Sequence, residues 1–353
     1  MRKIKAVIHL KSIYKNALAF KVLTGKKLCA VVKADAYGHG AEQVALAIES
    51  VVDVFAVALL AEACALRVAA CGKDILILTP PTCLEETVQA VQNGFIVTVG
   101  GITDAKLVVQ AAAIAGKTAR VHLKVNTGMN RYGMSASELG KTCVFLRGHT
   151  NVRVQGMYSH LYAQNKQEAY RARMHFLQLQ SVCKRYFVDI IYHLSATYGA
   201  LLGQDFAFDM VRIGIGLYGY LPDGAKDIDE KTAKNLCLQK GMSVYAYAVG
   251  TRKPSFGGVG YGKDLPKHCK RLAVYRVGYA DGFLRRQDNG MRGGEKNANC
   301  LCMDACIRNG SAKKGGETLI LQDALIAAQG IDSISYEVLC SVTKRAERTY
   351  EYT

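Results

Sequence analysis

The chain has 353 residues, half of them hydrophobic, which is enough for one large domain or two ordinary domains with a real core and excludes a disordered chain. The formal net charge is +17, from 46 Lys and Arg against 29 Asp and Glu. The basic residues stand in ones and twos, so we interpret them as a solvated surface that favours anionic small ligands, and we expect no nucleic-acid partner.

Targeting and membrane segments are not predicted. The apolar stretch in the N-terminal "MRKIKAVIHLKS" is too short for a signal peptide. The most apolar region, residues 51–71, is interrupted by Asp53, Glu62 and Arg67, which is not typical of a membrane span. Twelve cysteines without paired spacing indicate a reducing compartment. We therefore expect a cytoplasmic protein.

Short apolar runs alternate with helix-like stretches between residues 26 and 220. This alternation predicts an α/β fold, a parallel (β/α)8 barrel over residues 1–225. Eight strand candidates carry the pattern: "KLCAVVKAD", "VFAVALL", "DILILTP", "FIVTVG", "ARVHLKVNTG", "VRVQGMYSH", "IIYHLSAT" and "DMVRIGIGLYG".

A second, mostly β domain is predicted over residues 226–353. That region is richer in glycine and has little helical periodicity. Its strand candidates are "MSVYAYAVG", "RLAVYRVGYADG", "ETLILQ" and "YEVLCSV". The first strand of the chain, at about residues 1–10, is a candidate for pairing with this domain.

Two local patterns suggest sites that we reject. The cluster Cys300, Cys302 and Cys306 lacks the paired two-residue gaps of a zinc ribbon, so we expect packing and no metal. The run "GIGLYG" fits the dinucleotide fingerprint. It comes last in the alternation, however, and Lys234 stands where an acid belongs, so no nicotinamide site is predicted. Its glycines could still offer N–H groups to one phosphate.

Candidate chemical residues stand at the expected carboxyl ends of the barrel strands, where such barrels place their active sites. Lys33 in "AVVKADAYGHG" could be a strand-end lysine that reaches solvent. A buried lysine instead has a lowered pKa and becomes a nucleophile that forms Schiff bases with carbonyls. The other residues at such ends favour the second interpretation: Lys124, Arg131, His160, Thr197 and Arg212.

Seven motifs in order resemble the alanine racemases, and the resemblance spans nearly the whole chain. "AVVKADAYGHG" is similar to the family's pyridoxal-phosphate signature, and "HLKVNTGMNRYG", "RIGIGLYG" and "GGVGYGK" resemble further family segments. "VGYADG", "CMD" and "ISYEVLC" follow in the family's order. The resemblance implies a (β/α)8 barrel followed by a β domain, and a head-to-tail homodimer with shared active sites.

The resemblance also implies the catalytic residues of a two-base racemase. Lys33 would form the Schiff base with pyridoxal 5'-phosphate and move a proton on one face of the substrate Cα. Tyr261, supplied by the partner subunit, would serve the opposite face, helped by a network of His160 and Arg212. Arg212 would also face the pyridine nitrogen of the cofactor, which should disfavour transamination.

Further residues are implied for binding. The cofactor phosphate would contact the hydroxyls of Tyr37 and Tyr336, a hydroxyl of "HLSATYG", and the N–H groups of Gly214 and Ile215. In that loop we prefer Thr197 over Ser195. The substrate carboxylate would meet Arg131 and the N–H of the partner's Met303, with Tyr279 at the entrance. Lys124 matches a lysine that some members carry as a carbamate.

Alanine is the predicted substrate, and cell-wall D-alanine (a peptidoglycan precursor) is the product that the family implies. A serine or broad-specificity racemase of the same fold is the alternative, which the space-filling Tyr336 disfavours. Barrel-type amino-acid decarboxylases use a catalytic cysteine and other glycine signatures that this chain lacks. A non-catalytic protein that binds the cofactor or nucleic acid is the remote alternative, motivated by the charge of +17.

Overall fold

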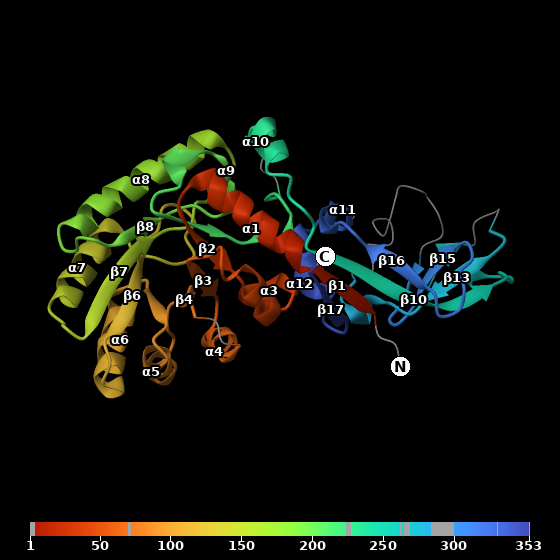
Figure 1. The fold of residues 1–353 in the computed structure, drawn as a ribbon, viewed down its shortest axis with the longest axis horizontal. Coiled ribbons are helices and arrows are strands. Elements are labelled where there is room, and N and C mark those ends of the chain that lie inside the picture. The colour runs from red at the N-terminus through yellow and green to blue at the C-terminus, as the bar shows by residue number, and fades with distance from the viewer. Residues whose placement is uncertain are drawn as a thin grey trace.

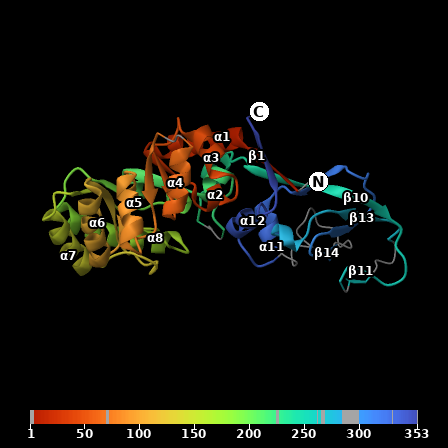
Figure 2. The same ribbon diagram turned by 90° about the horizontal axis from the view of Figure 1, so that it is seen from below.

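The computed structural model describes residues 4–69, 72–223, 227–261, 263–264, 269–283, 300–329 and 331–352. The described chain forms an elongated molecule with a barrel at one end and a β-rich domain at the other (Figure 1). The first and last strands of the described chain, β1 (Lys5–His9) and β17 (Glu347–Glu351), pair with each other near the junction of the two parts (Figure 1), and Figure 2 shows β1 from a second side.

The barrel contains eight parallel strands in the order β8-β7-β6-β5-β4-β3-β2-β9. Strands such as β3 and β5 are buried along their full length, because helices cover one face of the sheet and the other lines the barrel interior. This confirms the predicted barrel and its eight strands. Their bounds are β2 (Lys27–Val31), β3 (Val54–Val57), β4 (Asp74–Ile77), β5 (Ile96–Val99), β6 (Ala119–Lys124), β7 (Val152–Tyr158), β8 (Ile191–His193) and β9 (Met210–Ile213).

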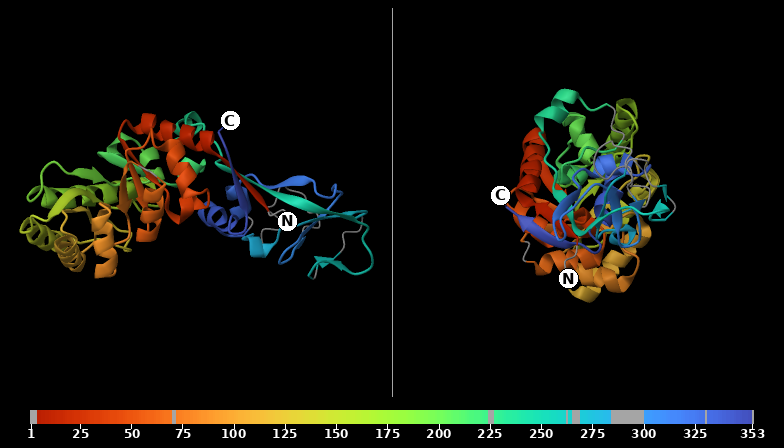
Figure 3. Two further views of the ribbon diagram at one scale, coloured as in Figure 1. Left: turned by 60° about the horizontal axis from the view of Figure 1, so that its bottom comes forward. Right: turned by 90° about the vertical axis from the view of Figure 1, so that its right-hand side faces the viewer.

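The seam between β8 and β9 is held by two backbone hydrogen bonds, so the barrel is nearly closed. Asp209 N donates to Tyr192 O at 3.0 Å, and Arg212 N donates to Ser195 O at 2.9 Å. Helices flank the strands on the outside (Figure 3). They are α1 (Leu10–Thr24), α3 (Ala41–Ile48), α4 (Leu60–Val68), α5 (Leu84–Gln92), α6 (Ile102–Ala115), α7 (Ala136–Arg147) and α8 (Lys166–Lys184). The short α9 (Thr197–Leu201) and η1 (Gln204–Phe206) stand between β8 and β9, and α10 (Glu230–Asn235) follows the barrel.

The second domain is built on a sheet in the order β14-β15-β13-β10-β1-β17, with β16 also paired to β10. The N-terminal strand β1 lies in this sheet, antiparallel to β10 and parallel to β17. The bounds are β1 (Lys5–His9), β10 (Met242–Arg252), β13 (Leu272–Tyr275), β14 (Cys300–Leu301), β15 (Cys306–Asn309), β16 (Glu317–Leu321) and β17 (Glu347–Glu351), with a small hairpin of β11 (Gly258–Val259) and β12 (Lys263–Asp264) and the turn η3 (Tyr279–Asp281).

The prediction of a strand at "YEVLCSV" was wrong, because this segment forms helix α12 (Ser335–Ser341), which follows α11 (Ala324–Gln329). The buried residues of the helix are Ser335, Val338 and Leu339, and Val342, directly after it, is also buried. These positions are three, four and seven residues apart, which is the spacing of one helix face and not the alternation of a strand. Because most residues of the run are apolar, this helical spacing could not be recognised from the sequence.

The cysteines are thiols throughout the described residues. Cys300 and Cys306 are buried and Cys302 is half-buried, as the packing prediction expected. Within the described ranges, no group of three His, Cys, Asp or Glu side chains could hold a metal ion. No helix in that part of the chain is long and apolar enough to cross a membrane.

The buried Asn16 ties α1 to the segment that leaves the barrel. Its Nδ2 donates to Leu217 O at 2.9 Å and Gln239 O at 2.7 Å, and its Oδ1 accepts from Gln239 N at 2.9 Å. Since Asn16→Ala leaves three backbone groups unpaired, in one buried and two partly buried hydrogen bonds, we expect it to lower the free energy of unfolding by about 3 kcal/mol. Denaturant unfolding followed by circular dichroism measures the change.

Ser12 on the same helix provides the matched control, because its hydroxyl makes an exposed hydrogen bond to the Gln239 side chain. We expect Ser12→Ala to change the free energy of unfolding by less than about 0.5 kcal/mol. Equal losses in the two variants would contradict the role assigned to Asn16.

Candidate active site

Lys33 lies just beyond β2, at the start of a left-handed turn. The turn α2 (Lys33–Tyr37) has positive φ angles at four successive non-glycine residues: 52° at Ala34 and Asp35, and 54° at Ala36 and Tyr37. Such residues each cost about 1–2 kcal/mol relative to right-handed backbone. Strain of this kind persists only where the surroundings fix it, which is common at functional sites.

Contacts from three elements hold the turn. Glu62 of α4 accepts a hydrogen bond from Ala34 N at 2.7 Å. Asp35 pairs with Arg348 of β17 at 2.7 Å and also accepts from Ala41 N at 2.7 Å. These contacts fix the point on the backbone from which the Lys33 side chain departs.

His39 closes the turn from inside. Its Nδ1–H donates to the carbonyls of Ala36 at 2.9 Å and Tyr37 at 3.0 Å, and its ring stacks on Tyr218. Burial lowers the pKa of His39 to about 4, although the two carbonyls oppose this change. His39 is therefore a neutral structural histidine at physiological pH.

Cationic side chains meet at the mouth of the barrel. Burial lowers the pKa of Lys33, helped by Arg131 and opposed by Glu62. Burial together with Arg212 and Arg131 lowers the pKa of Lys124 well below its usual range, and Lys124 is only 6% exposed.

His160 stands among these cations. Its pKa is well below the usual value, first because of burial and then because of the charges of four side chains: Arg212, Lys124, Arg131 and Lys33. Four of the residues predicted at the strand ends are thus close enough to His160 for their charges to lower its pKa. The region is suited to a small ligand that carries negative charge.

Arg212, on β9, is buried and fixed by four hydrogen bonds. Its Nη1 donates to His193 Nδ1 at 2.9 Å and to His193 O at 3.1 Å. Its Nη2 donates to Ser159 O at 2.6 Å and to Leu194 O at 3.0 Å. None of these four bonds goes to His160, and the charge of Arg212 lowers the pKa of His160. The network expected between His160 and Arg212 stays a prediction.

Hydroxyls and backbone N–H groups gather at a second end of the site. A Cβ on Gly214 would lie 2.5 Å from Tyr37 Oη, so only glycine fits there. Gly214 precedes the turn η2 (Ile215–Tyr218), and the first N–H groups of such a turn have no acceptor inside it. The Tyr336 ring lies 6.0 Å from the Tyr37 ring, so α12 of the second domain contributes to this end.

Thr197 and Ser195 differ in what their hydroxyls do. Ser195 Oγ donates to Phe206 O at 2.6 Å and is fully buried. Thr197 Oγ1 accepts from Gly216 N at 3.3 Å, which leaves its own proton to donate. The geometry thus leaves a free donor at Thr197, the residue preferred from the sequence.

Three predicted residues have exposed side chains. Tyr261, Met303 and Tyr279 belong to the second domain and are 66%, 52% and 38% exposed. Tyr261 follows the small hairpin strand β11, which lies at the far end of that domain from α2 in Figure 2.

The sequence analysis did not predict three residues around Arg212. His193 accepts a hydrogen bond from it, His122 bonds to His193, and the Tyr158 ring lies under the guanidinium. The Tyr158 ring stacks on His193 with 4.8 Å between centroids, and both cations Lys124 and Arg212 lie over it. One signal was available for His122, because alternate residues of a strand share a face and "HLK" places it beside Lys124.

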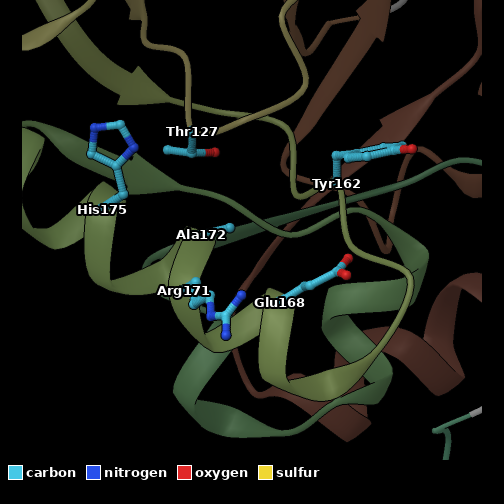
Figure 4. Close-up of a pocket in the computed structure, with 6 residues that line it drawn as sticks. All are labelled: Thr127, Tyr162, Glu168, Arg171, Ala172 and His175. Atoms are coloured by element: carbon cyan, nitrogen blue, oxygen red, sulfur yellow. The ribbon is translucent and has the colours of Figure 1, made fainter.

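A hollow beside the barrel mouth is separate from these residues. It is lined by Thr127, which comes from the loop after β6, and by residues of α8 and the loop before it (Figure 4). The lining residues are Thr127, Tyr162, Glu168, Arg171, Ala172 and His175, and none of them was predicted as a site residue.

Comparisons with known proteins give the same result for both domains of the chain. Residues 8–222 match the family model "Alanine racemase, N-terminal domain", and residues 242–350 match "Alanine racemase, C-terminal domain". The alanine racemase of Desulfovibrio desulfuricans is 32% identical, over 99% of this chain and 98% of that protein. The alanine racemase structure from Clostridium difficile 630 is 27% identical with a TM-score of 0.88, over 99% and 96% of the two chains.

A structure of alanine racemase from Bartonella henselae with covalently bound pyridoxal phosphate has the same fold, with 24% identity and a TM-score of 0.84. It is matched over 99% of this chain and 100% of that chain. The two family models together cover nearly all of the barrel and of the second domain. The chain belongs to the alanine racemase family of isomerases.

Proposed function

We propose that this protein is a pyridoxal 5'-phosphate-dependent racemase that interconverts L-alanine and D-alanine by two-base proton transfer. The observation that carries the proposal is the set of cations around His160. The four side chains whose charges lower the pKa of His160 are Lys or Arg. An anionic cofactor and a substrate carboxylate would supply the negative charge that these cations lack.

The residues fit the cofactor. Lys33 would hold the cofactor covalently. The four hydrogen bonds of Arg212 use its Nη1 and Nη2 donors, so its Nε–H would face the ring nitrogen of the cofactor. The phosphate would be bound by hydroxyls and N–H groups of Tyr37, Thr197, Gly214, Ile215 and Tyr336. The free donor of Thr197 and the close approach of Gly214 to Tyr37 support this assignment. When bound, pyridoxal phosphate withdraws electrons from the substrate Cα and so makes its hydrogen acidic.

Proton transfer needs one group on each face of Cα. Lys33 would serve one face, and its lowered pKa increases the share of neutral amine that can accept a proton. Tyr261 of a partner subunit would serve the other face, aided by the positive charge around His160 and Arg212. A homodimer is supported by the high exposure of Tyr261 and by the position of the preceding strand β11, which lies in the second domain away from α2 (Figure 2).

The substrate carboxylate would be bound by Arg131 and the backbone N–H at Met303 of the partner subunit. Tyr279 would line the entrance. The lowered pKa of Lys124 favours its neutral amine, which is the form that can become a carbamate. We infer alanine over serine because Tyr336 is half-buried against Tyr37 and reduces the space for a larger side chain.

Lys33→Ala tests the proposal. We expect loss of the absorbance of covalently bound cofactor and loss of all racemase activity, because Lys33 is the amine proposed to hold the cofactor. Absorption spectra and polarimetry with L-alanine measure both. The control is Lys27→Ala, an exposed lysine at the start of β2 that should leave both unchanged. Persistence of activity in Lys33→Ala would overturn the assignment.

Tyr261→Phe tests the second face. We expect removal of the α-proton of L-alanine to slow by about 100-fold or more, the usual contribution of an acid or base. Exchange of the D-alanine α-proton with solvent should persist, because Lys33 serves that isomer. NMR in D2O follows each isomer separately.

Tyr352→Phe is the control for the tyrosine variant, since Tyr352 is exposed to a similar extent, 62%. We expect it to behave as the unaltered protein. Equal rates for both isomers in Tyr261→Phe would show that another group serves the second face.

Arg131→Met has two expected effects. The KM for alanine should rise by about 10- to 100-fold, because a hydrogen bond to a charged group is lost. The pKa of Lys33 should also rise, since Arg131 lowers it. The neutral amine then appears at higher pH, so capture of pyridoxal phosphate by the cofactor-free protein should shift to higher pH.

Steady-state kinetics and pH-dependent capture rates measure these two effects. The exposed Arg153 on β7 offers the control Arg153→Met, which should change neither quantity. A raised KM without any shift of the capture profile would contradict the electrostatic link between Arg131 and Lys33.

A further inference from the structure

Two buried histidines continue the contacts of Arg212 into the barrel. His193 Nε2 lies 3.0 Å from His122 Nδ1, and His193 Nδ1 accepts from Arg212 Nη1 at 2.9 Å. His193 is fully buried and His122 is 1% exposed. The three side chains therefore form a chain of hydrogen bonds that runs from β9 through β8 to β6.

The direction of each hydrogen bond follows from the first one. A guanidinium only donates, so His193 Nδ1 carries no proton and the neutral ring carries it on Nε2. Nε2–H must then donate to His122 Nδ1, which places the proton of His122 on its Nε2 as well. Both tautomers are thus fixed by Arg212.

The surroundings keep both rings neutral. Burial lowers the pKa of His122 to about 3, helped by Arg212 and Arg120. Burial lowers the pKa of His193 well below its usual value, and Arg212, His122 and Lys124 add to this. The stacked Tyr158 ring is itself fixed, because its hydroxyl bonds to Thr98 Oγ1 at 2.8 Å.

We propose that His122 is a positioning residue, which acts through the Nε2 tautomer of His193 to lock the guanidinium of Arg212. Both protons of Nη1 and both of Nη2 are then engaged, so Nε–H is the one donor left to meet the ring nitrogen of the cofactor. The catalytic consequence of this inference rests on the proposed function. The hydrogen-bond chain itself is independent of that function.

The consequence concerns which reaction follows proton removal. With the cofactor bound, a guanidinium held at its ring nitrogen would leave that nitrogen unprotonated and would favour return of a proton to the substrate Cα. A loosely held guanidinium would allow more turnovers to end in transamination, in which two electrons and the amino group would pass to the cofactor and water would supply the oxygen of the keto acid.

The first test needs no cofactor chemistry. We expect 15N NMR of histidine-labelled protein to show two rings that stay neutral with the proton on Nε2 between pH 5 and 9. The variants His122→Asn and His193→Asn assign the signals by their loss. An Nδ1–H tautomer in either ring, or titration of either near pH 6.5, would overturn the proposal.

The second test uses the loaded enzyme and a matched pair of variants. His122→Leu removes the acceptor for His193 Nε2–H, whereas His122→Asn keeps an oxygen near the position of Nδ1. We expect the ratio of pyruvate formed to alanine racemised to rise about tenfold in His122→Leu, as one hydrogen bond to a charged group is weakened. The ratio should stay within about twofold of the unaltered enzyme in His122→Asn.

A purely structural role for His122 would lower kcat without changing that ratio, and this outcome would overturn the proposal. If His122→Leu does not fold, the tautomers measured by NMR decide alone. Absence of any racemase activity in the unaltered protein would instead refute the proposed function, while the NMR result would still judge the histidine chain.

Discussion

The buried charge of Arg212 is the constraint on which the site depends. A guanidinium inside a barrel loses its hydration, and a buried charge is tolerated only when it is hydrogen-bonded or paired. Within the described residues the partners of Arg212 are a neutral imidazole and three carbonyls, and no carboxylate pairs with it. The positive charge is therefore not cancelled, and it lowers the pKa values of His160 and Lys124. In the proposed function, an anionic cofactor and a substrate carboxylate would supply the opposite charge.

The second constraint is the left-handed turn after Lys33. Four residues with positive φ would not keep this backbone unaided. One of the contacts that fix it is the ion pair of Asp35 with Arg348, a residue of the C-terminal strand β17. The second domain thus has two roles in the proposed dimer. Through β17 and α12 it supports the turn that carries the lysine of its own barrel, and its exposed Tyr261 would serve another subunit.

Much of this architecture could be predicted from sequence. The eight apolar runs became the eight barrel strands, since buried parallel strands read as continuous apolar segments. Lys33, Lys124, His160 and Arg212 were predicted to meet because the carboxyl ends of the strands share one edge. The motifs of "KADAYGHG" and "RIGIGLYG" pointed to the same family that the comparisons identify.

Other features depend on tertiary contacts that no local pattern contains. The left-handed turn in "KADAY" uses residues with no preference for positive φ, and Glu62 and Arg348 impose it from a distance in sequence. Helix α12 was predicted as a strand because its sequence is a nearly continuous apolar run, in which the helical spacing of the buried residues is not visible. The pairing of His122 with His193 joins residues 71 positions apart, and only the barrel brings them into contact.

The most direct test of the central claim is a single experiment with purified protein and pyridoxal phosphate in D2O. L-alanine and L-serine are offered separately, and optical rotation is followed together with deuterium at Cα. We expect alanine to lose its optical activity and gain deuterium at Cα much faster than serine. Deuterium uptake without inversion would contradict the two-base account, and no exchange with either amino acid would contradict the assignment of the reaction.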